Sequence, residues 1–199
     1  MNVKNYRKRL IEEEIINKLA YSGAVYIEGP KWAGKSTTAS LYSNTIIKLQ
    51  NPIIKKQYQT LATISKEEVL SGEKPILFDE WQEVPEIWDF IRLDIDDNNY
   101  VGAYLLTGST KKQNIITSHT GTGRINSVIM RPMSLFESGD SSGQVSLKSL
   151  IDGNKIIAQK SDVTINDIAT YICRGGWPGS LDLPLTAQLS IPKDLLSSI

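Results

Sequence analysis

Hydrophobic residues occur along this chain either in short uninterrupted runs or at the spacing of a helix face. Short apolar runs predict strands buried on both sides, and apolar residues three or four positions apart predict amphipathic helices. Strands are expected at residues 24–27, 45–49, 76–79, 104–107 and 127–130, of which the second is the weakest. Helices are expected at residues 10–19, 35–42, 65–72, 84–96, 145–151 and 164–174. The alternation predicts an α/β fold with a parallel sheet covered by helices on both faces.

Residues 138–143 (SGDSSG) are rich in turn-forming residues and are expected to link two parts of the chain. The part before the linker, residues 1–138, holds all five expected strands. The part after it, residues 144–199, holds only expected helices. We expect this second part to be a partial helical segment, a lid cut short by truncation.

The composition is that of an ordinary globular protein, with 40% hydrophobic and 22% charged residues. A chain of 199 residues suffices for one α/β domain with a small appendage. The 22 basic and 22 acidic residues balance, so no global positive field favours nucleic acid as a partner. Lys4, Arg7, Lys8 and Arg9 precede three glutamates and are interpreted as a solvated helix face, not a phosphate-binding stripe.

The sequence also bears on the compartment. Cys173 is the only cysteine, which excludes an internal disulfide and fits a reducing environment. No apolar run approaches the roughly 20 residues of a membrane-spanning helix. Residues 1–16 are basic and then acidic, and they lack the apolar core of a signal peptide. We therefore expect a cytoplasmic protein without a membrane partner.

The main motif is residues 29–36 (GPKWAGKS), which match G-x-x-x-x-G-K-[ST] at every fixed position. In such a P-loop, backbone N–H groups surround phosphate oxygens, and glycines permit the close approach. Lys35 is expected to reach the β- and γ-phosphates, and the Ser36 hydroxyl to ligate Mg²⁺. The expected strand before the loop and helix after it fit this interpretation, although Trp32 can equally serve in packing. The motif predicts binding of ATP with Mg²⁺ through Gly29, Pro30, Trp32, Ala33, Gly34, Lys35, Ser36 and Thr37.

A second part of the site is expected at residues 76–80 (ILFDE), an apolar strand that ends in two carboxylates. Asp79 is expected to hold Mg²⁺ at the carboxyl end of its strand, where open α/β sheets bind ligands. Glu80 is expected to act as the general base that polarises the attacking water. Acidic residues also end many strands without any catalytic role, and it is the preceding P-loop that favours the functional interpretation.

Two further segments offer polar groups. Residues 105–109 (LLTGS) again place small polar residues after a strand, so Thr107 or Ser109 either contacts the water or γ-phosphate or merely forms a turn. Arg124 ends a glycine-containing loop before the last strand. It either supplies charge to a γ-phosphate, in its own subunit or a neighbour, or is a structural arginine. His119, the only histidine, is interpreted as a loop residue and not as a metal ligand.

Six stretches resemble the prokaryotic AAA-type P-loop ATPases that carry a C-terminal DUF4143 region. They are residues 27–39 (IEGPKWAGKSTTA), 76–89 (ILFDEWQEVPEIWD), 105–110 (LLTGST), 121–125 (GTGRI), 130–139 (MRPMSLFESG) and 173–181 (CRGGWPGSL). The resemblance implies an AAA-type fold with a five-stranded parallel sheet of order 5-1-4-3-2. It also implies Glu80 as the catalytic glutamate, Thr107 or Ser109 at the sensor-1 place, and Arg124 at an arginine-finger position.

The same resemblance bears on the ends of the chain. Gly176-Trp177-Pro178 is similar to a G-x-P element that reports bound nucleotide, so Pro178 is a candidate nucleotide contact; a simple helix stop and turn fits as well. Tyr6 and Arg9 precede the core and are guessed to lie near the base. Members of the family continue beyond the G-x-P element, so we expect the C-terminal region to be missing here.

These residues bear on four classes of function. The leading hypothesis is an ATPase that couples hydrolysis to a conformational change, as a homo-oligomer if Arg124 acts on a neighbour, with a protein partner still unknown. The second is a nucleotide-dependent switch with negligible turnover. P-loop kinases usually need a lid rich in arginine. A kinase is disfavoured because Arg124 and Arg131 are the only arginines between Thr107 and the linker. A GTPase is disfavoured because the sequence has no N-K-x-D motif.

Overall fold

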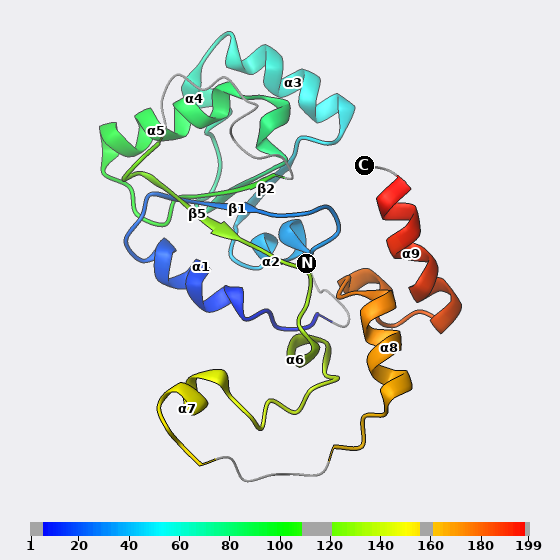
Figure 1. Cartoon of the computed structure of the whole chain (residues 1–199). Helices are drawn as coiled ribbons and strands as arrows, with labels where there is room; N and C mark the ends of the chain where they lie inside the picture. The colour runs from blue at the N-terminus through cyan, green and yellow to red at the C-terminus, as the bar shows by residue number, and fades with distance from the viewer. Residues whose placement is uncertain (1–5, 109–120, 156–160, 198–199) are drawn as a thin grey trace. The chain divides into compact units, whose positions relative to one another are not determined.

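The computed structural model describes residues 6–108, 121–155 and 161–197 (Figure 1). The chain divides into two compact units, the first reaching to Arg131 and the second starting at Pro132. The expected domain ranges 1–138 and 144–199 stay a prediction. Within the described residues, no helix is long and apolar enough to cross a membrane.

The first unit is built on a five-stranded sheet in which every neighbouring pair of strands is parallel. The strands are β1 (Ala24–Glu28), β2 (Thr45–Lys48), β3 (Ile76–Asp79), β4 (Tyr104–Gly108) and β5 (Ile125–Ile129). Their order is β2-β3-β4-β1-β5. This is the expected order 5-1-4-3-2 read from the other edge, so the predicted α/β fold is confirmed. The carboxyl ends of β1, β3 and β4 meet at one edge of the sheet, because Ile27 and Asp79 both lie opposite Thr107.

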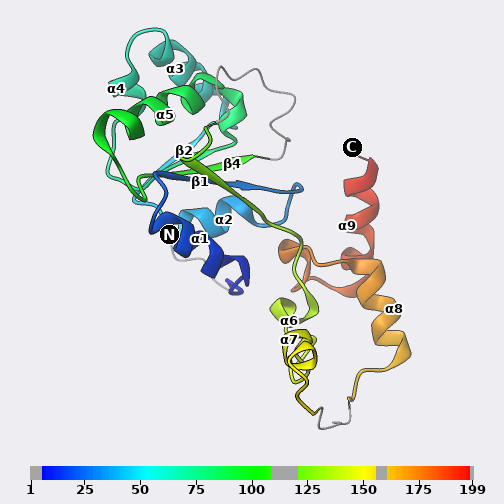
Figure 2. The same ribbon diagram turned by 60° about the vertical axis from the view of Figure 1, so that its left-hand side comes forward.

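The sheet separates two hydrophobic clusters. Since successive strand residues point to opposite faces, Tyr26 lies in one cluster and its neighbours Val25 and Ile27 lie in the other. Figures 1 and 2 show helices against both faces of the sheet. The first face carries α3 (Pro52–Ala62), α4 (Lys66–Val69) and α5 (Glu86–Asn98), and the second carries α1 (Ile11–Leu19) and α2 (Lys35–Ser40). Because both faces are covered, the three central strands are buried throughout except at Glu28, the last residue of β1.

Side-chain caps start several of the helices. Ser65 accepts a hydrogen bond from the backbone N–H of Glu68 and starts α4, which lies within the helix expected at residues 65–72. Asn51 caps α3, with Pro52 in its first turn. Sequence patterning missed α3, whose apolar residues Ile54, Tyr58, Leu61 and Ala62 contact the core but are only partly buried.

The second unit is helical in its described parts. Its elements are α6 (Leu135–Ser138), α7 (Leu147–Ile151), α8 (Ile165–Arg174), the short 3-10 helix η3 (Pro178–Ser180) and α9 (Leu185–Ser197). The backbone N–H of Met133 donates a 2.6 Å hydrogen bond to the carbonyl of Gly176, which joins the start of the unit to the segment after α8. A Cβ atom at Gly176 would lie 2.0 Å from the carbonyl oxygen of Met133, so only glycine permits this approach. Arg174 forms an ion pair with Asp140 nearby in the same unit.

Candidate functional site

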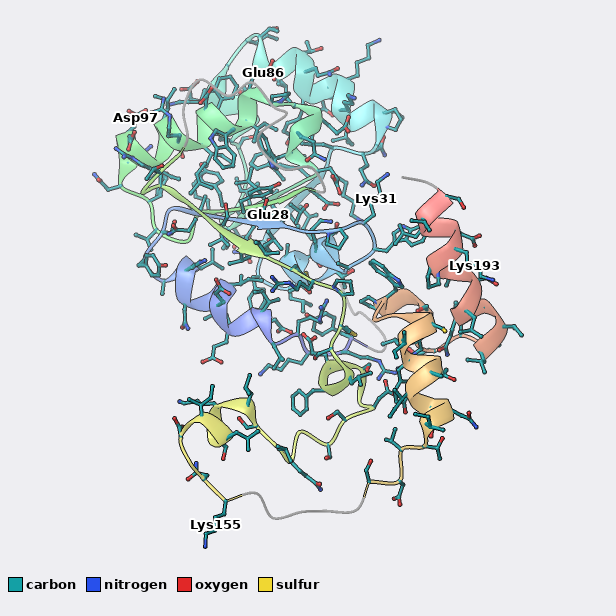
Figure 3. All side chains as sticks on the ribbon, viewed as in Figure 1. Glu28, Lys31, Glu86, Asp97, Lys155 and Lys193 are labelled. Atoms are coloured by element: carbon teal, nitrogen blue, oxygen red, sulfur yellow. The ribbon has the colours of Figure 1, made fainter. Side chains whose placement is uncertain are left out.

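The loop between β1 and α2 is shaped by unusual backbone angles. Figure 3 labels Glu28 at the end of β1 and Lys31 in the loop itself. Gly29 has a φ of 154°, and a Cβ atom there would lie 2.1 Å from the carbonyl oxygen of Met130. Trp32 and Gly34 both have left-handed φ angles, of 63° and 97°. Residues in this left-handed conformation point their backbone N–H groups toward the concave side of the loop, which suits an anion.

Lys35 lies inside this loop and is only 5% exposed. Its Nζ atom donates hydrogen bonds of 2.8 Å to the carbonyl of Gly29 and 2.9 Å to that of Pro30. Burial lowers the pKa of Lys35, while the nearby charges of Glu80 and Asp79 act in the opposite direction. The loop therefore holds a desolvated cation that its own carbonyls stabilise.

Three hydroxyl and carboxyl groups meet at the carboxyl edge of the sheet. Oδ1 of Asp79 accepts a hydrogen bond of 2.5 Å from the Ser36 hydroxyl and another of 2.5 Å from the Thr107 hydroxyl. Asp79 is 6% exposed and Thr107 is fully buried. Hydroxyl and carboxylate oxygens are the ligands that Mg²⁺ prefers. No group of three His, Cys, Asp or Glu residues that could hold a metal occurs within the described residues. A metal here would thus take one serine, one carboxylate, water and ligand oxygens, as Mg²⁺ does with phosphates.

Glu80 follows β3 in a backbone conformation that is uncommon for a residue with a side chain. Its φ is 59°, and the residue is 8% exposed. Its backbone N–H donates a 3.1 Å hydrogen bond to the Thr107 hydroxyl. Its Oε2 atom accepts a hydrogen bond from the side-chain amide of Gln82. Left-handed strain of this kind is concentrated at functional sites. Sequence reasoning did not single out Gln82, although its place two residues after Glu80 was a visible signal.

Arg124 lies at the other edge of the sheet. Its carbonyl accepts a hydrogen bond from the N–H of Ala24, so Arg124 lies at the start of β1. Lys35 belongs to the loop and helix that follow the end of β1. One five-residue strand spans about 13 Å, so the structure does not bring Arg124 to the loop of its own chain. The Arg124 side chain instead pairs with Asp96, with Nε 2.6 Å from Oδ1.

Three other residues considered in the sequence analysis do not join this group. Pro178 is the first residue of η3 in the second unit, and its contact with nucleotide stays a prediction. Ser109 and His119 lie outside the described residues.

Arg9 contacts the loop from the segment before α1. It is 3% exposed, and its guanidinium donates hydrogen bonds of 2.6 Å to the carbonyl of Ala33 and 2.7 Å to that of Arg131. The interpretation of the basic cluster as a solvated face is therefore wrong for Arg9, because backbone carbonyls satisfy its charge in the interior. Arg9 was also guessed to lie near a nucleotide base, but the partners that its guanidinium contacts here are backbone carbonyls.

Glu12 extends this contact to α2. It is 5% exposed and accepts hydrogen bonds from the hydroxyls of Tyr6 (2.9 Å) and Tyr42 (2.6 Å), and from the N–H of Arg9. The Tyr6 hydroxyl also lies 3.0 Å from that of Thr38 in α2. Burial would raise the pKa of Glu12, but these hydrogen bonds outweigh burial and lower it. Chiefly because of burial, the pKa of Tyr6 rises to about 12.

Comparison with known proteins gives a matching family model and a similar solved structure. A family model described as an AAA domain matches residues 21–138. No curated protein matches the sequence. Among solved structures, a Walker-type ATPase of Pyrococcus abyssi is similar, with a TM-score of 0.52 and 15% sequence identity. That match covers 98% of this chain and 74% of the other. At such identity the likeness concerns the fold.

Proposed function

This chain belongs to the AAA domain family, and from that premise we propose that it binds ATP with Mg²⁺ on the loop 29–36 and hydrolyses it. The observation that carries the proposal is the shared acceptor Oδ1 of Asp79. It joins the hydroxyl of Ser36, from the loop, to the hydroxyl of Thr107, from β4. The three chain segments expected to contact the triphosphate therefore converge on one carboxylate.

Binding rests on the loop and on Lys35. The Lys35 ammonium is held at the carbonyls of Gly29 and Pro30, within the loop that surrounds the phosphates. Phosphate oxygens are stronger acceptors for this cation than neutral carbonyls, since donor and acceptor then carry opposite charges. A buried, partly desolvated lysine is thus ready to exchange its carbonyl partners for the β- and γ-phosphates.

Ser36 and Asp79 are the residues that would hold Mg²⁺. The ion, when bound, neutralises charge that develops on the phosphate oxygens. Thr107 donates to the same Oδ1 atom of Asp79 as Ser36 does, so two hydrogen bonds fix the carboxylate before any ligand arrives. This pre-organised pair of oxygen atoms fits the small coordination sphere that Mg²⁺ requires.

Hydrolysis is assigned to Glu80. Water attacks the γ-phosphorus, the bond to the β-phosphate oxygen breaks, and Glu80 accepts the proton from the water. Thr107 contributes indirectly, because its hydroxyl accepts the N–H of Glu80 while it donates to Asp79. One threonine therefore couples the position of the base to that of the metal-binding carboxylate, in the place expected for sensor 1.

A nucleotide switch with negligible turnover is the second candidate, and the place of Arg124 favours it for an isolated chain. Arg124 lies at the edge of the sheet opposite Lys35, so a single chain cannot place that charge on its own γ-phosphate. Under the leading proposal, self-association supplies Arg124 from a neighbour. Residues 130–139 and 173–181 further support the proposal that this AAA domain works with a C-terminal DUF4143 region and couples hydrolysis to a movement sensed at Pro178.

The test is phosphate release from ATP and Mg²⁺ measured over a range of protein concentrations, with Glu80→Gln and Lys35→Ala as controls. We expect turnover that rises more than linearly with protein concentration. Glu80→Gln should bind nucleotide without turnover, and Lys35→Ala should lose binding. Binding without turnover in the wild type would favour the switch, and the absence of binding would overturn both candidates.

A further inference from the structure

The carboxylate of Glu80 is held by a neighbour that no expectation included. The side-chain amide of Gln82 donates a hydrogen bond from Nε2 to Oε2 of Glu80. The contact arises from a tight turn: the chain leaves β3 with Glu80 in a left-handed conformation and continues as the 3-10 helix η1 (Trp81–Glu83). The N–H of Glu83 closes this turn with a 3.0 Å hydrogen bond to the carbonyl of Glu80. The turn brings Gln82 back to the carboxylate that precedes it.

The amide of Gln82 is confined at the end of β4. A Cβ atom at Gly108 would lie 2.7 Å from Oε1 of Gln82 and 3.0 Å from the hydroxyl of Tyr26. A larger residue at position 108 would therefore displace the amide. An ionised carboxylate only accepts hydrogen bonds, so Nε2 must face Glu80 and Oε1 must face away from it. The geometry leaves the amide a single useful orientation.

The side-chain oxygen of Gln82 shows that packing alone does not explain why a glutamine occupies position 82. Oε1 of Gln82 is buried and has no hydrogen-bond partner in the part of the chain that the structure describes. An unpaired buried acceptor is unfavourable, and a leucine of similar size would fill the same space without it. The donor side of the amide is thus what the site uses.

The group that Gln82 contacts is the proposed general base, and its charge acts on Lys35 within the phosphate-binding loop. We propose that Gln82 is a positioning residue, which holds the Glu80 carboxylate in the orientation that activates the attacking water. This role rests on the proposed hydrolysis of ATP. The left-handed backbone of Glu80 sets the direction in which its side chain leaves the chain, and the hydrogen bond from Gln82 sets the position of the carboxylate.

The test compares Gln82→Leu, Gln82→Glu and Gln82→Asn with the wild type. Measured are kcat, the Kd for ATP with Mg²⁺ in the Glu80→Gln background, and the thermal midpoint. Misplacing a catalytic group by about 1 Å costs on the order of 100-fold in rate. We therefore expect Gln82→Leu to lower kcat about 10- to 100-fold without lowering the midpoint or raising Kd more than about twofold. Gln82→Glu should lose more, because it sets a second carboxylate against Glu80, and Gln82→Asn should keep partial activity. Gln59→Leu, at an exposed position on α3, is the matched control.

The outcomes separate the two proposals. Normal kcat in Gln82→Leu would overturn the positioning role while leaving ATP hydrolysis in place. A parallel loss of kcat, affinity and thermal midpoint would also overturn it, since that pattern describes a structural residue. A wild type without turnover would instead overturn the proposed hydrolysis, and with it any role of Gln82 in catalysis.

Discussion

The guanidinium of Arg9 donates a 2.6 Å hydrogen bond to the carbonyl oxygen of Ala33, inside the loop 29–36. Its second contact, with the carbonyl of Arg131, ties the same side chain to the segment after β5. A carbonyl of the loop that is bound from outside cannot turn into the loop, where the N–H groups must face the phosphates. Arg9 therefore stabilises the loop conformation in which we propose that phosphate binds, without being part of the motif.

Replacing Arg9 by alanine removes both contacts and leaves two carbonyls without a donor. We expect the free energy of unfolding to fall by about 2–4 kcal/mol, since hydrogen bonds of charged donors are worth about 1.5–3 kcal/mol each and are not fully additive. Affinity for ATP with Mg²⁺ should fall as well. Denaturant titration and nucleotide binding measure the two effects, and the exposed Lys8→Ala is the control. An Arg9→Ala variant with wild-type affinity would remove Arg9 from the organisation of the loop.

Most of the sheet could be predicted from the sequence, for a physical reason. A parallel strand covered on both faces must be apolar throughout, and the runs at β1, β3 and β4 show this directly. The helices α3 and α9 were not predicted. Ile54, Tyr58, Leu61 and Ala62 of α3 pack against the core at helical spacing. They are only partly buried, however, and the neighbouring Ile53 is 77% exposed, which obscures the apolar face in the sequence. Pro192 lies inside α9 and reads in the sequence as a helix breaker.

The site was predictable only where its residues belong to strand ends or to the loop motif. Asp79 and Thr107 are paired at the carboxyl ends of neighbouring parallel strands, so the topology brings them together as expected. Arg9 and Ala33 are 24 residues apart, and the contact uses a backbone carbonyl that every residue possesses. Such a contact leaves no pattern in the sequence. The position of Arg124 relative to Lys35, by contrast, follows from strand direction alone, because Arg124 precedes β5, Lys35 follows β1, and the two strands are parallel.

The buried carboxylate of Glu12 predicts a dependence of stability on pH. Its pKa is lowered below the ordinary value of 4.5 by hydrogen bonds from Tyr42, Arg9 and Tyr6. A lowered folded-state pKa stabilises the fold above 4.5, and this contribution is lost as pH falls through the folded-state value. We expect Glu12→Gln to cost about 1–3 kcal/mol at neutral pH, with a cost that shrinks in acid. Urea titrations at several pH values check this against the exposed Glu13→Gln, and a cost independent of pH would contradict it.

Thr107→Val tests the link between the two carboxylates. Valine keeps the shape of the buried side chain but removes the hydroxyl that donates to Asp79 and accepts from the N–H of Glu80. We expect a loss of about 1–3 kcal/mol in stability, because a buried N–H is left unpaired. Metal-dependent turnover should fall more than nucleotide affinity. The exposed Thr60→Val, whose hydroxyl contacts only the carbonyl of Lys56 among the hydrogen bonds described, should change neither.

Gly176 predicts a steric effect within the second unit. A Cβ atom there would meet the carbonyl oxygen of Met133 at 2.0 Å and its nitrogen at 2.8 Å, and backbone atoms cannot move aside cheaply. We expect Gly176→Ala to break the hydrogen bond between Met133 and residue 176 and to cost about 1–3 kcal/mol. Faster hydrogen exchange at the Met133 amide would show this. Gly179→Ala, with nothing within 4 Å of the added methyl, should exchange like the wild type.

Arg124 and Lys35 lie at opposite edges of the sheet, so a role for Arg124 in hydrolysis requires a second copy of the chain. Arg124→Ala should then lower turnover by about 10- to 1,000-fold, at or below the lower end of the rate effect of arginines that a neighbouring subunit supplies to the transition state. Mixing Arg124→Ala with Glu80→Gln should restore activity, because the Glu80→Gln subunit still donates Arg124 to an intact site. Arg92→Ala is the matched control, since Arg92 also pairs with Asp96. If the Arg92 and Arg124 variants lose activity equally and the mixture stays inactive, Arg124 serves only its ion pair.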